Sequence, residues 1–222
     1  MREPATATPP DIVHRVARRR GLLDFSTISP LDAALPNAGN RFDVVGGGVL
    51  YAGSTPEACY AETLARFRPT PRIRELVKDE PGFMVTGGVP QDWRLQRTIG
   101  DLILQNPIPF LDVEDPQTHD YLSEVLASEL VGLGYNDVLD ISDICNRDRR
   151  LSRAISLHAY TATETDGTPT YSGIRYMSRI ASGWECWAIF DGTTVEVDDQ
   201  RSIEPRDPGL QRIAELWGLR IF

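Results

Sequence analysis

The sequence has few cysteines and histidines, and neither kind is arranged to hold a metal ion or a disulfide framework. The three cysteines, Cys59, Cys145 and Cys186, are odd in number and far apart, and no C-x-x-C pair occurs. The histidines are equally scattered, at His14, His119 and His158. We therefore expect no metal site and no disulfides, and we interpret the cysteines as small buried apolar residues.

Basic charge and long apolar runs are also lacking. A net charge of −9 and a pI near 4.9 argue against a broad phosphate-binding surface, so we expect neither nucleic acid nor a membrane as a direct partner. A local basic pocket remains compatible with this balance. The first residues lack the apolar segment of a signal peptide, and no run approaches the ~20 apolar residues that span a bilayer. We therefore expect a cytoplasmic protein.

What is present is the composition of an ordinary globular protein. The 222 residues are 41% hydrophobic and 25% charged, which suits one domain with a full core. We predict a flexible tail over residues 1–10, rich in Pro, Thr and Ala, and a single domain over 11–222. The apolar end at 216–219 suits either a core element or an interface, so a homo-oligomer remains open.

The order of the expected elements indicates the fold class. We predict strands at 49–51, 82–89, 138–141, 171–178, 184–190 and 219–222, and extended structure at 93–99. Residues 12–20 suit a strand or a short helix, and 30–40 a loop. Helices are predicted at 55–66, 72–79, 117–133, 148–160 and 208–217. Strands and helices alternate irregularly, without βαβ periodicity, and we therefore predict an α+β fold.

Residues 41–62 contain side chains of three chemical kinds. Arg41 precedes a glycine turn, Tyr51 lies in the apolar run after it, and Glu62 lies about two turns into the following helix. A guanidinium, an aromatic ring and a carboxylate thus belong to one strand–helix unit. This set suits a substrate with a phosphate, a flat heteroaromatic ring and a sugar hydroxyl, such as NAD.

The helix that carries Glu62 has its own start signals. Ser54 is predicted to be the N-cap, and Glu57 stands three residues later, as in a capping box. Alanines make a small-residue face next to Glu62, so we expect this carboxylate to point inward or to the edge of a cleft. The alternative is a solvated Glu62 paired with Arg66 at i+4.

A second motif lies later in the chain. Residues 173–179 are Gly-Ile-Arg-Tyr-Met-Ser-Arg, and residues 187–190 are Trp-Ala-Ile-Phe. Together with Arg41, Leu50-Tyr51 and Ala61-Glu62, these blocks resemble the RES domain family, named for its Arg, Glu and Ser. Each block alone is weak, whereas two blocks in this order, joined by a helical middle, make a specific match. The resemblance covers about residues 14–204.

The resemblance implies both a fold and an activity. It implies an ADP-ribosyltransferase-like mixed sheet core with flanking helices. It also implies an enzyme that degrades NAD+ by phosphorolysis or hydrolysis and releases nicotinamide. NAD+ is then a substrate, inorganic phosphate a possible co-substrate, and no cofactor is expected. Many members are toxins of type II toxin–antitoxin pairs, which implies a DNA-binding antitoxin of the Xre type as the partner.

Carried over by position, the catalytic residues are Arg41, Tyr51, Glu62 and Ser178. Arg41 is expected to bind the diphosphate or the incoming phosphate, and Tyr51 to stack on nicotinamide. Glu62 is expected to stabilise the cation on the ribose, and Ser178 to bond the ribose or the amide. Taken singly, Arg41 also suits a structural ion pair, Tyr51 a core position and Ser178 a strand-end cap.

Three residues of the second motif leave questions open. Arg175 and Arg179 suit either a second anion contact with the substrate or the exposed face of a strand. Met177 stands where the family often has Pro before the Ser, which changes the backbone restriction on the preceding residue.

Two other functions stay open. One is an ADP-ribosyltransferase that modifies a protein or a small molecule in the same pocket. The other is a non-enzymatic interaction module of the same fold, and the retained Arg, Tyr, Glu and Ser argue against it.

Overall fold

The computed structural model describes residues 3–78 and 86–222. Within them, one mixed sheet has the strand order β1-β6-β7-β8-β3-β2-β5-β9, and only the β6–β7 pair is parallel. Its strands are β1 Thr6–Ala7, β2 Val13–Arg18, β3 Val49–Gly53, β5 Arg97–Leu104, β6 Phe110–Asp112, β7 Gly173–Met177, β8 Glu185–Phe190 and β9 Val195–Ser202. A separate parallel pair joins β4 Gly88–Val89 to β10 Arg220–Ile221.

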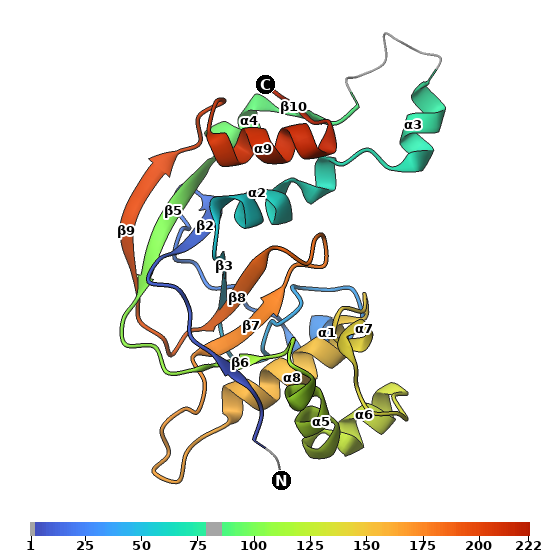
Figure 1. The fold of residues 1–222 in the computed structure, drawn as a ribbon, viewed down its shortest axis with the longest axis vertical. Helices are drawn as coiled ribbons and strands as arrows, with labels where there is room; N and C mark the ends of the chain where they lie inside the picture. Colours follow the sequence, from blue (N-terminus) through green and yellow to red (C-terminus); the bar gives the residue numbers. More distant parts are fainter. Residues whose placement is uncertain (1–2, 79–85) are drawn as a thin grey trace.

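The helices form two groups on the sheet (Figure 1). Their bounds are α1 Pro30–Ala33, α2 Pro56–Leu64, α3 Pro71–Val77, α4 Gln91–Leu95, α5 Pro116–Val125, α6 Ala127–Leu133, α7 Ile141–Ile144, α8 Arg149–Thr161 and α9 Pro208–Trp217, with a 3-10 turn at Ala65–Phe67. Helices α2 and α9 lie together near one end of the molecule, and α5 to α8 lie together near the other. The predicted α+β class is confirmed.

Each helical group has its own core. Helices α5, α6 and α8 cover one part of the sheet, and Leu122, Ile155 and Ile174 are fully buried there. Helices α2 and α9 pack on each other and on β2 and β5, where Leu64 and Ile99 are fully buried. Because the two groups bury different parts of the sheet, the strands between them are left open to form a site.

Several predicted elements are confirmed. The helix predicted at 208–217 is α9, because Asp207 Oδ1 accepts from Leu210 N at 3.1 Å and Gly218 ends it in the left-handed conformation. The strands β3, β7 and β8 and the helix α8 also lie where the patterns predicted them. Residues 12–20 form a strand, β2, and not a helix. The helix predicted at 117–133 is interrupted at Leu126, which separates α5 from α6.

Other predictions are wrong. Residues 6–7 are not part of a loose tail, because β1 pairs with β6. The loop predicted at 30–40 contains α1, which Ser29 caps. Residues 138–141 form no strand, because the side chain of Asp140 caps α7. The extended segment predicted at 93–99 is α4 followed by the start of β5.

Two further differences concern strands. Strand β9 was not predicted, because it is mostly exposed and polar and has only two apolar residues, Val195 and Val197. It pairs at the sheet edge with β5, so its backbone and not its side chains hold it there. Of the strand predicted at 82–89, residues 82–85 lie outside the described residues, and Gly88–Val89 form β4.

The start of α2 differs in detail from the prediction. Thr55, not Ser54, is the N-cap, and its Oγ1 accepts from Ala58 N at 3.2 Å. Ser54 Oγ instead donates to Glu185 and accepts from Trp187 Nε1 at 2.8 Å. Ser54 therefore joins the loop before α2 to strand β8. Among the described helices, none combines the length and the apolar character that a membrane span requires.

Candidate active site

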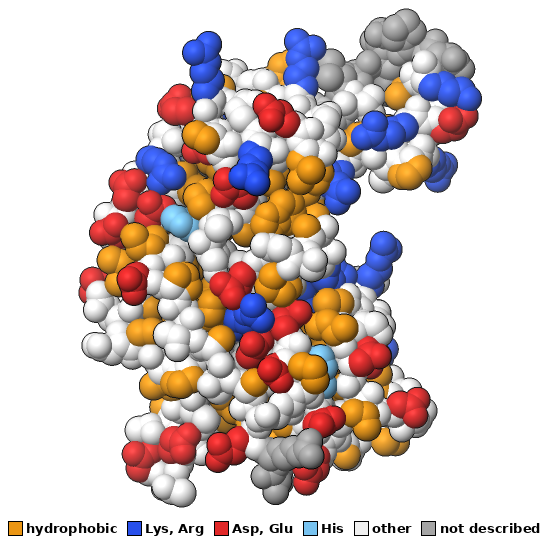
Figure 2. Space-filling view, viewed as in Figure 1, with side chains coloured by type: hydrophobic (Ala, Val, Ile, Leu, Met, Phe, Trp, Pro, Cys, Tyr) orange, Lys and Arg blue, Asp and Glu red, His pale blue; other side chains and the backbone are white. Residues whose placement is uncertain are grey.

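A cavity of about 690 Å³ lies between the two helical groups. Figure 2 shows the surface hollowed between the α2–α3 side and the α7 side of the molecule. Its lining includes six arginines, Arg15, Arg18, Arg41, Arg97, Arg149 and Arg179. The carboxylates in the lining are Asp24 and Glu62. The volume is in the range of small-molecule and cofactor sites, and the charge favours an anionic ligand.

Glu62 and Ser178 meet at this cavity although 116 positions separate them. Ser178 Oγ donates to Glu62 Oε1 at 2.5 Å, and the same hydroxyl accepts from Ile180 N at 3.1 Å. Ser178 itself is 4% exposed. Its hydroxyl therefore has both a donor and an acceptor contact already, and its geometry suits holding the Glu62 carboxylate in place. Glu62 lines the cavity, as the cleft-edge prediction requires.

Tyr51 presents its ring to the cavity and ties its hydroxyl to the protein. Its hydroxyl donates to Asp43 Oδ1 at 2.9 Å and accepts from Phe42 N at 3.1 Å. Burial, and then the negative charge of Asp43, raise the pKa of Tyr51 well above its ordinary value. Tyr51 therefore stays protonated at neutral pH, and its contribution to a ligand is a fixed aromatic ring.

Arg41 lies between two aromatic rings. The guanidinium carbon lies 5.0 Å from the centroid of Phe42 and 5.1 Å from that of Tyr176. Its Nη2 donates to Ile144 O at 3.0 Å and its Nη1 to Met177 O at 3.4 Å, while Nε is buried without a partner. Carbonyl groups and rings hold this cation, and no ion pair to a carboxylate is formed within the described residues. The structural ion pair considered for Arg41 is absent from this part of the chain.

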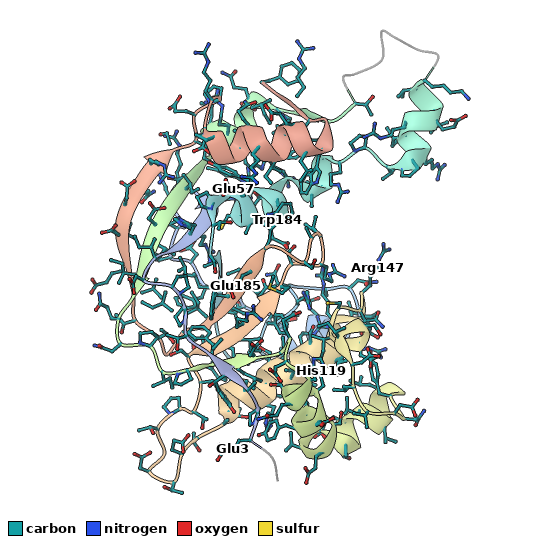
Figure 3. The ribbon with its side chains drawn as sticks, viewed as in Figure 1. Glu3, Glu57, His119, Arg147, Trp184 and Glu185 are labelled. Atoms are coloured by element: carbon teal, nitrogen blue, oxygen red, sulfur yellow. The ribbon has the colours of Figure 1, made fainter. Side chains whose placement is uncertain are left out.

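Arg179 follows β7 and is exposed at the cavity. Burial of part of the side chain lowers its pKa, and the positive charges of Arg41 and Arg149 lower it further. Glu62 acts in the opposite direction, and Arg147 adds to the repulsion. Figure 3 shows Arg147 on the α7 side of the hollow. These guanidinium groups repel one another, so an anion among them would be stabilised.

Arg175 is not part of this cavity. Its Nε donates to Glu185 Oε1 at 2.9 Å and its Nη1 to Asp112 Oδ1 at 3.1 Å, so it bridges β8 and β6 across β7. Figure 3 shows Glu185 on the central strands. The second anion contact considered for Arg175 stays a prediction; in this structure two carboxylates already take its donors.

Backbone contacts in the second motif explain why position 173 is glycine and what Met177 contributes. A Cβ at Gly173 would lie 2.1 Å from Ala188 O on β8, so only glycine fits this close approach. Met177 N donates to Glu114 Oε1 at 2.8 Å. A proline at position 177 has no N–H and could not make this bond, so Met177 adds a contact to the strand end that precedes Ser178.

Thiols and imidazoles do not supply a nucleophile or a base at the cavity. Cys59 and Cys186 line it, and burial raises the pKa of Cys59 to about 12 and that of Cys186 further. The expectation that the cysteines are buried is confirmed for Cys59 and Cys186, whereas Cys145 is only half-buried. None of the histidines is in the described lining, and none of the described His, Cys, Asp and Glu residues form a group able to hold a metal.

Several residues of the site were not predicted from the sequence. Arg15 lies on β2, and its Nη2 donates to Asp24 O at 2.8 Å. Asp43 is 1% exposed and accepts from Tyr51 and from Asn40 N at 2.6 Å. Arg149 begins α8 and also lines the cavity. Of these three residues, only Arg15 could have been noticed in the sequence, as an arginine in the strand at 13–18. The contacts of Asp43 and Arg149 with the site depend on the geometry of loops.

Comparison with known proteins identifies the family. A family model described as the RES domain matches residues 12–209. No curated protein matches the chain. Among solved structures, a chain in the crystal structure of the M.tuberculosis MbcT-MbcA toxin-antitoxin complex is similar. That chain is 12% identical with a TM-score of 0.49, over 95% of this chain and 92% of that one. Because the family match spans most of its length, this chain belongs to the RES domain family.

Proposed function

We propose that this protein is an enzyme that degrades NAD+ by cleaving the bond between nicotinamide and ribose. The observation that carries the proposal is the Ser178–Glu62 hydrogen bond beside a cavity lined by six arginines. Membership of the RES domain family supports it, since Arg41, Tyr51, Glu62 and Ser178 are the residues that the resemblance to that family implies.

Cleavage of the nicotinamide–ribose bond requires one negative charge close to the ribose. Cleavage builds positive charge on the anomeric carbon of the ribose, and nicotinamide leaves as a neutral group that needs no proton. Glu62 would stabilise that cation and accept a hydrogen bond from a ribose hydroxyl. Ser178 would act through Glu62 as a positioning residue, because its donor is used on Oε1.

The arginines would hold the charged end of the substrate. Arg179 carries no ion pair within the described residues and stands near Arg41 and Arg149, which suits the diphosphate of NAD+. Tyr51 would offer its ring to the nicotinamide, with its hydroxyl fixed by Asp43. Positioning and charge would then supply most of the rate enhancement.

We also propose that the protein is the toxin of a type II toxin–antitoxin pair, with an antitoxin of the Xre type as its partner. The support is membership of the RES domain family, to which many such toxins belong. Co-expression of the neighbouring reading frame with this chain would test it. The expected result is co-purification and loss of NAD+ turnover.

Phosphorus NMR of NAD+ incubated with the purified protein tests the activity and its acceptor. A new sugar-phosphate signal that requires inorganic phosphate would indicate a phosphorylase. Free ADP-ribose formed without phosphate would indicate a glycohydrolase. Intact NAD+ in both samples would contradict the proposal and favour transfer of ADP-ribose to a target or a non-enzymatic role.

A further inference from the structure

Two arginines of the cavity face each other across neighbouring strands. Arg18 on β2 and Arg97 on β5 are direct partners in the antiparallel register. Both line the cavity. Like charges placed directly opposite each other on a sheet are unfavourable, so this pair lowers the stability of the empty protein.

The described residues do not neutralise this pair. Arg97 Nη1 donates to Trp93 O at 3.1 Å, and its guanidinium lies 5.2 Å from the Trp93 ring centroid. Burial lowers the pKa of Arg97, and the positive charges of Arg66 and Arg18 lower it further. Arg66 lies one turn beyond Glu62, in the 3-10 turn that follows α2. No carboxylate of residues 3–78 or 86–222 forms an ion pair with Arg18, Arg66 or Arg97.

This set is separate from the arginines near the Glu62–Ser178 pair. The positive charges that act on Arg179 are those of Arg41, Arg149 and Arg147, from the loop before β3, the first residue of α8 and the turn between α7 and α8. Those that act on Arg97 come from β2 and from the end of α2. The cavity therefore has two basic regions, supplied by different elements of the fold.

We propose that Arg18 and Arg97 form a second anion subsite that takes a phosphate group other than the diphosphate of the substrate. The proposal rests on the proposed function for the identity of the first anion. A phosphate dianion offers oxygen atoms that match the planar forks of several guanidinium groups, and its charge removes their mutual repulsion. Its source is either an additional phosphate on the dinucleotide or free inorganic phosphate.

The double variant Arg18→Gln/Arg97→Gln tests the subsite without reference to turnover. The matched control is Arg19→Gln/Arg20→Gln, which removes the same charge from exposed positions outside the cavity lining. Inorganic phosphate is titrated into each protein and followed by calorimetry. We expect about tenfold weaker binding in the double variant and unchanged binding in the control.

Thermal unfolding distinguishes a lost subsite from a folding defect. Without phosphate the double variant should melt at or above the temperature of the wild type, because a repulsion has been removed. With phosphate the wild type should gain more in melting temperature than the double variant. Equal phosphate affinity in the wild type, the double variant and the control would overturn the proposal.

Measurements of turnover with different substrates distinguish the two sources of phosphate. A selective loss of activity on NADP relative to NAD+ in the double variant would assign the subsite to a phosphate carried by the dinucleotide. A rise of about tenfold in the KM for inorganic phosphate, with NAD+ as the substrate, would assign it to free phosphate. If the wild type consumes no NAD+, the proposed function fails, and the phosphate titration still decides whether the subsite exists.

Discussion

The cavity and the rest of the molecule carry opposite charge. The chain has 23 Lys and Arg against 32 Asp and Glu, yet six arginines and two carboxylates line the cavity. The overall balance excludes a broad phosphate-binding surface, and it says nothing about a concave site whose low-dielectric walls focus a local field. Average charge is therefore a guide to surfaces and not to cavities.

The same contrast appears within one motif. Arg175 and Arg179 are four positions apart, and only Arg179 is free to meet a ligand. Arg175 is paired because it projects from the middle of β7, between Asp112 and Glu185 on the neighbouring strands. Arg179 lies beyond the end of the strand, and it forms no ion pair within residues 3–78 and 86–222. Substitutions in the cavity should therefore act on turnover, and substitutions outside it on stability.

Glu62→Gln should have the largest effect on turnover. It keeps the size and hydrogen bonding of the side chain but removes the charge that stabilises the ribose cation. We expect kcat for NAD+ cleavage to fall by about 100- to 1,000-fold, with the melting temperature unchanged. Glu57→Gln on the same helix lies outside the cavity lining and is the matched control. Unchanged turnover in Glu62→Gln would refute the role given to this carboxylate.

Ser178→Ala should reduce kcat by a smaller factor, about 10-fold, because Glu62 keeps its charge but loses the bond that orients it. The KM for NAD+ should change little, since the hydroxyl has no free donor for the substrate. Steady-state kinetics separate the two parameters. A large rise in KM with kcat unchanged would instead place Ser178 in direct contact with the substrate.

Arg179→Gln and Arg175→Gln form a matched pair with different expected outcomes. Arg179→Gln should raise the KM for NAD+ about tenfold without changing the melting temperature. Arg175→Gln should leave the KM unchanged and lower the free energy of unfolding by about 1–2 kcal/mol, because Asp112 and Glu185 lose their partner in a half-buried site. Urea unfolding and steady-state kinetics measure both quantities. A raised KM in Arg175→Gln and a lowered free energy of unfolding in Arg179→Gln would contradict the roles given to the two arginines.

The smallest effect concerns His158, which lies outside the cavity and whose Nε2 is 2.9 Å from Tyr121 Oη. Burial lowers its pKa below the ordinary value of 6.5. Because the unfolded chain binds the proton more readily, the contribution of His158 to stability is fully present above pH 6.5 and is lost as the pH falls below 6.5 and through the lower pKa of the folded state. His158→Gln should remove this part of the pH dependence of the melting temperature without changing turnover. An unchanged pH dependence would contradict the assignment.

The sequence was a good guide where local signals and burial agree. Helix α9 is capped by Asp207 and closed by Gly218, and its apolar stripe faces the core, so its bounds follow from local patterns. It was a poor guide where a backbone contact decides the structure. Strand β9 is held at the sheet edge by pairing with β5, and Thr6–Ala7 by pairing with β6, and neither segment has the sustained apolar alternation of a strand.

The α+β class, the family and the residue types of the site follow from motifs and periodic patterns, which are properties of the chain alone. Which of these residues act together depends on the folded arrangement. It placed Ser178 on Glu62, across 116 positions, and it paired Arg175 with carboxylates while leaving Arg179 at the cavity. The physical reason is that distances between side chains far apart in the chain depend on how strands pair and helices pack, which no local pattern encodes.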